Sequence, residues 1–368
     1  MRAHEIHIFS PRVTDRRLLT RYMAGQEITQ LLPAIPVFDL RTETQPSLAA
    51  MRAAPVRAES LWHWARGHYT PAGLAFADRL SRHWLRRNDN PLRAEIEAIS
   101  AALPGPGGHA LNLSFEWGCT VGLGAAEAPF MLRVLDWPLE GLGERLCVFN
   151  QAGPAGEWFN LGWPGFAGVI TALAPGRFGI AINQPPLPQI ALARMTRRAG
   201  ADFLGLAVDW LAARPARWRH RGLPPAHLLR MVCDTAPDYA AALAMLRDTP
   251  LAAGAIFSLA GIKPGEATVI ERAEAAHAVI EAAPTAVAAN GWQCIANPGA
   301  PRWRYSAERH AAMTALLSGP VPGEFGWLKP PIANEGSRLA AMMCPATGRL
   351  ELLGLEGGEA VTRPLYLN

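Results

Sequence analysis

The feature that most restricts the fold is a change of sequence pattern at the segment PGPGG, residues 104–108. Before it, "SLWHWARGHYTPAGLAFADRLSRHWLRR" and "NPLRAEIEAISAALP" space their apolar residues at helical intervals, with a break at Thr70. From Ala110 onward, short apolar runs separated by Gly, Pro and Asn turns predict antiparallel strands. We therefore expect a mostly helical first part, residues 1–105, and a second part that begins with a sheet.

The order of the remaining segments predicts a layered fold. Helical patterns return at residues 196–248, and four strand-like segments follow over residues 253–297. The short helix "SAERHAAMTALLS" then precedes a closing hairpin, "RLAAMMCPATGRLELLGLE". Because each sheet and each helix must bury one apolar face against another layer, sheet, helices and sheet again predict an α+β sandwich.

The charge balance argues against a nucleic-acid partner. The chain of 368 residues carries 35 Lys and Arg against 31 Asp and Glu, a formal net charge of +4. Its basic residues are scattered rather than clustered on one segment, so the basic stripe that nucleic-acid binding needs is missing.

The cysteines and the N-terminal segment restrict the kinds of site and the cellular compartment that we expect. Five cysteines without a C-x-x-C pair predict neither a disulfide framework nor a zinc site, and "HEIH" is one residue too short for the H-E-x-x-H pattern. We therefore expect no metal and no cofactor. The start, "MRAHEIHIFSPRVTDRR", lacks the apolar core of a signal peptide, and no window reaches the length of a membrane span. These observations predict a cytoplasmic protein.

One cysteine has an unusual setting. Cys119 follows Gly118 inside the apolar run "LNLSFEWGCTVGLG", and Arg133 and Asp136 lie on the next predicted strand. A cysteine alone is most often a small core residue. Gly118 has no Cβ, so the peptide before Cys119 can be approached closely. A guanidinium near a thiol favours the thiolate, although spacing alone makes an ordinary ion pair the simpler interpretation of Arg133 and Asp136.

Four segments in the same order resemble the acid ceramidase and N-acylethanolamine acid amidase family of N-terminal nucleophile hydrolases. They are "LNLSFEWGCTVGL…LRVLDWP", "WPGFAGVITALAPGRFGIAINQ", "DTPLAAGAIFSLAGIKPGEATVIER" and "WQCIANPGAPRW…SAERHAAM". The wider group includes the choloylglycine hydrolases and the isopenicillin N acyltransferase. The resemblance implies a four-layer αββα sandwich, with the nucleophile at the start of a central strand.

The resemblance also implies that the chain cuts itself. The cut would fall between Gly118 and Cys119, giving an N-terminal, mostly helical chain of residues 1–118 and a catalytic chain of residues 119–368. The new α-amine, whose unperturbed pKa is about 7.7–8.0, would act as general base for the thiol of the same residue. No histidine would be needed.

The family's functional residues map onto five further positions. Asp136 matches the aspartate that orients the new amine, and Arg133 matches the arginine that stabilises the thiolate. Asn297 matches a proposed oxyanion donor, and Asn183 fits a second polar position that faces the substrate. Arg309 aligns with the family's late arginine.

These residues lead to one main hypothesis and two alternatives. The main hypothesis is a self-processing cysteine amidase that hydrolyses a linear amide of a small N-acyl compound, with a fatty or other apolar acyl group, through a thioester. One alternative is an acyltransferase that uses the same thioester. The other is an inactive binding or scaffold protein, suggested by Val134 and "ANPGAPRW", where the family has Asn and "TNYDHW".

The tryptophans of the helical part leave a membrane contact open. Trp62, Trp64 and Trp84 lie beside arginines, which would suit a membrane surface, but a plain core position explains them equally well. The sequence does not indicate the oligomeric state.

Overall fold

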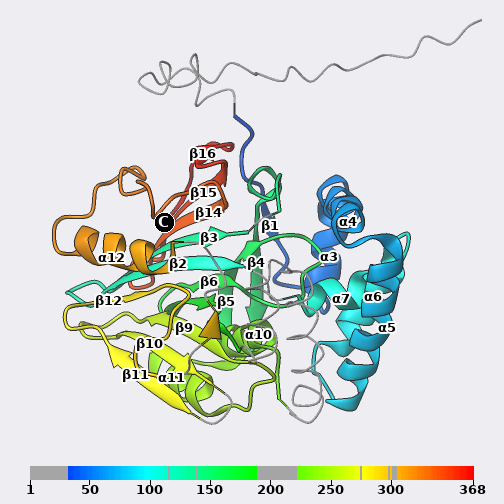
Figure 1. Cartoon of the computed structure of the whole chain (residues 1–368), viewed down its shortest axis with the longest axis horizontal. Helices are drawn as coiled ribbons and strands as arrows, with labels where there is room; N and C mark the ends of the chain where they lie inside the picture. Colours follow the sequence, from blue (N-terminus) through cyan, green and yellow to red (C-terminus); the bar gives the residue numbers. More distant parts are fainter. Residues whose placement is uncertain are drawn as a thin grey trace, which may run out of the picture.

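The computed structural model describes residues 32–368 apart from 115–116, 138, 189–221, 274–275, 297–298 and 301–304. Helices predicted before residue 105 form one side of the molecule (Figure 1). They are α3 (Pro46–Ala53), α4 (Pro55–Tyr69), α5 (Pro71–Arg87) and α6 (Arg93–Ala102). None of the helices in the described ranges is both long enough and apolar enough to cross a membrane.

The predicted break at Thr70 is confirmed. Helix α4 ends at Tyr69, and the Thr70 hydroxyl accepts the backbone N–H of Gly73 at the start of α5. Pro71 occupies the first position of α5, where its missing N–H leaves no helical hydrogen bond unmade.

The strand predicted from Ala110 is wrong for its first residues. Residues Gly108–Asn112 form a short helix, α7, and the strand begins only at Gly118. The cause lies in α5, where the Asp78 carboxylate accepts the backbone N–H groups of His109 and Ala110 at 2.7 and 3.0 Å. An acidic side chain that accepts the first N–H groups of a helix favours the helical turn.

Two sheets form the centre of the molecule. The first, sheet A, has the order β1-β4-β5-β6-β7-β9-β10-β11, and its pairs are antiparallel except for β1 with β4. Its strands are β1 (Val37–Asp39), β4 (Cys147–Gly153), β5 (Gly156–Gly162), β6 (Thr171–Ala174), β7 (Phe178–Asn183), β9 (Ala255–Ala260), β10 (Ala267–Arg272) and β11 (His277–Glu281). Strand β1 shows that the N-terminal part supplies an edge strand as well as helices.

The second sheet, sheet B, has the order β12-β2-β3-β14-β15-β16, with β17 also paired to β15. Its strands are β12 (Thr285–Ala288), β2 (Gly118–Gly124), β3 (Phe130–Asp136), β14 (Ser337–Cys344), β15 (Arg349–Glu356), β16 (Glu359–Ala360) and β17 (Leu365–Leu367). The predicted hairpin over residues 338–356 is therefore confirmed as β14 and β15. The strand predicted to run on to residue 297 stops at Ala288, because the Asn290 side chain accepts the Cys119 N–H and the Asn290 N–H bonds to Ser306. Further on, the N–H groups of residues 293–295 bond to the Glu271 carboxylate instead of a neighbouring strand.

The layers confirm the predicted αββα sandwich. Strands β2 and β3 of sheet B contact β7 and β9 of sheet A, so the two sheets pack face to face. Helices α10 (Pro225–Thr235) and α11 (Tyr239–Asp248) cover sheet A, and α12 (Ser306–Leu317) covers sheet B (Figure 1). The division into chains 1–118 and 119–368 stays a prediction.

Strand β2 is buried on both faces. Its odd-numbered residues, Cys119, Val121 and Leu123, belong to the core between the sheets. Gly122 faces α12, where a Cβ would lie 2.7 Å from the sulfur of Met313. Because β2 has no side chain at this position, α12 approaches closely enough for its Arg309 to reach β2 and β3.

We expect Gly122→Val to displace α12. Overpacking of this kind typically costs about 1–3 kcal/mol of unfolding free energy. Denaturant unfolding measures the loss, and Gly67→Ala in α4 is the control, since a Cβ at Gly67 would meet no heavy atom within 4 Å among the described residues outside its own helical turn. Equal stability of the two variants would contradict this description of the contact.

Candidate active site

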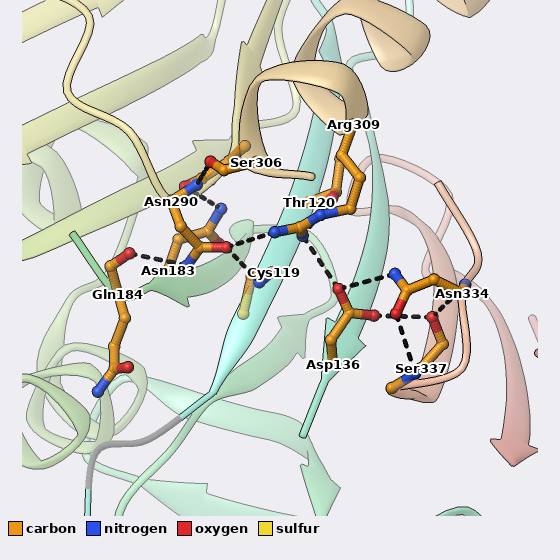
Figure 2. Close-up of polar contacts among 12 residues, drawn as sticks. Cys119, Thr120, Asp136, Asn183, Gln184, Asn290, Ser306, Arg309, Asn334 and Ser337 are labelled. Atoms are coloured by element: carbon orange, nitrogen blue, oxygen red, sulfur yellow. Dashed lines mark hydrogen bonds and ion pairs between the residues drawn. The ribbon is translucent and has the colours of Figure 1, made fainter. Parts of the chain in front are cut away.

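Cys119 is the second residue of β2, the strand that lies between β12 and β3. The residue is fully buried, and its side chain points toward sheet A, where the thiol donates to the carbonyl of Ile182 at 3.6 Å. Its backbone N–H donates to Oδ1 of Asn290 at 2.9 Å. The sulfur and the backbone nitrogen of this residue therefore both have defined polar partners, and Figure 2 shows the contact between the nitrogen and Asn290.

The thiol has a cationic neighbour. Arg133 lies on β3 in the same face of sheet B, and its Nη2 donates to Sγ of Cys119 and to the Ile182 carbonyl, both at 2.8 Å. Its Nη1 donates to Oδ1 of Asn183 at the end of β7. Asn183 in turn donates to the carbonyls of Ala288 and Ala289, so it ties sheet A to the end of β12.

Burial dominates the protonation of this part of the site. Burial raises the pKa of the Cys119 thiol from its ordinary value of 9.0 to about 12, against the opposing effect of the Arg133 charge. Burial also lowers the pKa of the Arg133 guanidinium, which the nearby thiol partly offsets. The thiol is therefore neutral at physiological pH in this structure.

An ion pair lies on the opposite face of β2 and β3. Arg309 from α12 donates to Asp136 at 3.0 Å, and both side chains are fully buried. The same guanidinium donates to the Thr120 hydroxyl at 2.9 Å and to Oδ1 of Asn290 at 2.8 Å. Burial lowers the pKa of Arg309, and the charge of Asp136 opposes this effect.

Two neutral donors complete the environment of Asp136. Ser337 Oγ donates to its Oδ1 at 2.7 Å, and Asn334 Nδ2 donates to its Oδ2 at 3.2 Å. With Arg309, three donors from two separate segments orient this carboxylate. Among the described residues, Arg309 and Asn290 connect Asp136 with the Cys119 nitrogen. The role that the resemblance implies for Asp136, orienting a new amine at Cys119, stays a prediction.

Asn290 is the residue that sequence reasoning missed. Its Oδ1 accepts from both the Cys119 nitrogen and Arg309, and its Nδ2 donates to the Gln184 carbonyl at 2.8 Å. The register between β12 and β2 pairs Ala288 with Val121, and continuing it by two residues places Asn290 opposite Cys119. A polar residue two positions after β12 becomes a signal only once the pairing of β12 with β2 is known, and the sequence alone does not give that pairing.

The structure brings most of the predicted residues together. Arg133 and Asn183 lie on the thiol face, and Asp136 and Arg309 lie on the α12 face, whereas Asn297 lies outside the described residues. Gly118 starts β2.

The departure at Val134 does not affect the thiol. The Val134 side chain packs in an apolar cluster with Met313 and Leu317 of α12, on the face of sheet B away from the Cys119 thiol. The suspicion of inactivity that rested on Val134 therefore loses its structural basis.

Comparisons with solved structures find similar folds at low identity. An N-acylethanolamine-hydrolyzing acid amidase ortholog of Caenorhabditis elegans is 18% identical with a TM-score of 0.45, and the alignment covers 62% of this chain and 93% of that one. A conjugated bile acid hydrolase of Clostridium perfringens (9%, TM-score 0.36; 68% and 92% covered) and a penicillin V acylase of Agrobacterium tumefaciens (14%, TM-score 0.36; 64% and 83% covered) are also similar.

These three enzymes belong to the N-terminal nucleophile hydrolases that the sequence motifs resemble. No family model and no curated protein sequence matches the chain. We therefore argue the function from the contacts around Cys119.

Breaking the buried ion pair should destabilise the fold. We expect Asp136→Asn to lower the unfolding free energy by about 3–5 kcal/mol, because it leaves the Arg309 charge buried without its anion. Urea unfolding measures the loss. Asp248→Asn is the control, since that carboxylate forms an exposed pair with Arg247 and its loss should change stability little. Similar stabilities of the two variants would refute the importance of the buried pair.

The thiol of Cys119 should not react with external reagents while the chain is uncut. We expect iodoacetamide at pH 8 to label the exposed Cys294 while Cys119 reacts only after denaturation, because Cys119 is both buried and protonated. Since its pKa is raised above 9.0, this thiol contributes to stability in full below pH 9, and the contribution is lost as the pH rises towards 12. Peptide mapping identifies the labelled cysteines, and a peptide that spans Gly118 and Cys119 reports on the uncut chain. Fast labelling of Cys119 within that peptide, before denaturation, would contradict the prediction.

Proposed function

We propose that this protein is a self-processing cysteine amidohydrolase. The observation that carries the proposal is that both the thiol and the backbone nitrogen of Cys119 have dedicated buried partners, Arg133 for the sulfur and Asn290 for the nitrogen. A structural cysteine needs a packing environment only. A residue that supplies its own nucleophile and its own general base needs both atoms oriented.

The proposed self-cleavage proceeds by acyl transfer from nitrogen to sulfur. The Cys119 sulfur attacks the Gly118 carbonyl carbon and forms a thioester, the Gly118–Cys119 C–N bond breaks, and the nitrogen leaves as an amine that takes up the thiol proton. Water then hydrolyses the thioester, which gives a Gly118 carboxylate and frees the thiol. Asn290, held by Arg309, fixes the nitrogen while this bond breaks.

Turnover then uses the same two atoms. The free α-amine, with an unperturbed pKa of about 7.7–8.0, takes the thiol proton, and the Arg133 guanidinium stabilises the resulting thiolate. The thiolate attacks the carbonyl carbon of an amide, and the protonated amine of Cys119 returns its proton to the departing amine. Water hydrolyses the thioester acyl-enzyme. Asn297 remains the predicted oxyanion donor.

The proposed substrate is a small linear amide with an apolar acyl group. The resemblance of the motifs around Cys119 supports this choice, as does the similarity to acid amidase and acylase structures. A membrane contact through the helical part stays a proposal. Such a membrane contact would depend on the exposed side chains of Val56 and Phe76, since Trp62 is only 3% exposed and packs in the core.

Intact mass under denaturing conditions tests the proposal. We expect the wild type to split between Gly118 and Cys119 and Cys119→Ala to remain one chain, because only the former has a nucleophile at the junction. Cys294→Ala is the matched control, since it removes an exposed cysteine and should still be cut. A wild type that stays whole and also fails to hydrolyse N-acyl amides would favour the binding or scaffold alternative.

A further inference from the structure

We infer that Glu271 is a positioning residue for the active site. Its carboxylate fixes the loop that follows β12, and through this loop it fixes the carboxamide of Asn290. The inference rests on the proposed function, because it gives Glu271 a role in the chemistry of Cys119.

Glu271 is a fully buried carboxylate on β10. Its Oε1 accepts the backbone N–H of Gln293, and its Oε2 accepts those of Cys294 and Ile295, both at 3.0 Å. Within the described part of the chain its partners are these three consecutive N–H groups, and none of them is a cation. The negative charge is therefore stabilised by the loop backbone itself.

Such an arrangement constrains the loop strongly. A buried carboxylate is costly unless donors satisfy it, and hydrogen bonds to a charged acceptor are stronger than those between neutral groups. Three successive N–H groups converge on one carboxylate only when the backbone curves around it. Glu271 therefore selects one loop conformation, and it does so from sheet A, whereas the loop leaves a strand of sheet B.

The loop is also tied to the elements that form the site. It begins directly after Asn290. Gln293 donates through Nε2 to the Val287 carbonyl of β12 at 2.7 Å, and its Oε1 lies 3.2 Å from Nε2 of His310 on α12. His310 follows Arg309 in the helix. The segment held by Glu271 thus connects the strand before Asn290 with the helix that carries its second partner.

The consequence for chemistry comes through Asn290. Its oxygen must meet the Cys119 nitrogen and Arg309 at the same time, so a small displacement of the loop breaks at least one contact. Misplacement of a reacting group by 1 Å can lower a rate by about 100-fold. Glu271 touches none of the reacting atoms and acts only through the loop.

Hydrogen exchange of the uncut Cys119→Ala chain tests the positioning without requiring activity. Adding Glu271→Gln, which replaces one accepting oxygen with an N–H donor, should speed exchange of the amides of residues 293–295 and of residue 119 by roughly 10- to 100-fold. Asn290→Ala is the positive control at residue 119. Glu95→Gln is the matched control, because Glu95 is a buried carboxylate on α6 that accepts the N–H of Ser47, and it should leave residue 119 unchanged.

Faster exchange of the loop with unchanged exchange of residue 119 would overturn the inference. If Glu271→Gln does not fold, Glu271→Asp, which keeps the charge on a side chain one methylene shorter, is measured in the same background with the same two outcomes.

Self-cleavage rates then separate positioning from a general loss of structure. Glu271→Gln should slow cleavage of the Cys119 chain by about 100-fold, yet add little to Asn290→Ala, because both changes remove the same contact. Equal slowing in both backgrounds would show that Glu271 acts independently of Asn290 and would refute the inference. A wild type that does not cleave refutes the proposed function instead, while the exchange measurement still tests Glu271.

Discussion

The buried contact between Asp136 and Arg309 is the interaction on which the site depends. Taking two charges out of water costs several kcal/mol per ion, and the cost is offset only when each ion finds its partner and its remaining hydrogen bonds. Here Arg309 meets the carboxylate, the Thr120 hydroxyl and the Asn290 carboxamide, and Ser337 and Asn334 complete Asp136. The direction of the Asn290 oxygen, and therefore of the Cys119 nitrogen, follows from this arrangement.

The geometry of one strand explains how a single residue can have such different partners. Successive side chains of a strand point to opposite faces, and its N–H groups point sideways within the sheet. At the start of β2 the Cys119 thiol therefore faces the core between the sheets, and the Thr120 hydroxyl faces α12. The Cys119 N–H points toward the continuation of β12, where Asn290 lies. Three layers of the sandwich contribute to the surroundings of two consecutive residues.

The sequence predicted those elements whose conformation is determined by residues nearby in the chain. Helical spacing predicted α5 and the capped break at Thr70, and alternating apolar residues predicted β3 and the hairpin of β14 and β15. The roles of Arg133 and Asp136 were predicted from the resemblance of the motifs, not from the spacing of the two residues. The outward direction of Val134 could have been predicted, because it follows Arg133 in the same strand and must point the opposite way.

Features that depend on distant pairing were not predictable from one sequence. Helix α7 depends on Asp78, which lies 31 residues before His109 along the chain. Asn290 lies 171 residues after Cys119, and only the pairing of β12 with β2 brings the two together. Residues 293–295, which the sequence predicted as strand, bond instead to Glu271 of the other sheet. In each case a polar side chain from a remote segment overrides the local pattern.

Burial of the thiol gives the proposed processing step a further consequence. In the uncut chain desolvation raises the pKa of Cys119, so the nucleophile is weakest while its nitrogen still belongs to a peptide bond. Cutting that bond replaces an N–H group with an amine that can accept the thiol proton, within the same residue and beside the same Asn290 oxygen. Arg133 is present before and after the cut, so its charge alone does not ionise the thiol. The thiol attacks its own neighbouring carbonyl once, within the same chain, and the base that the cut creates would then let the same thiol attack external amides repeatedly.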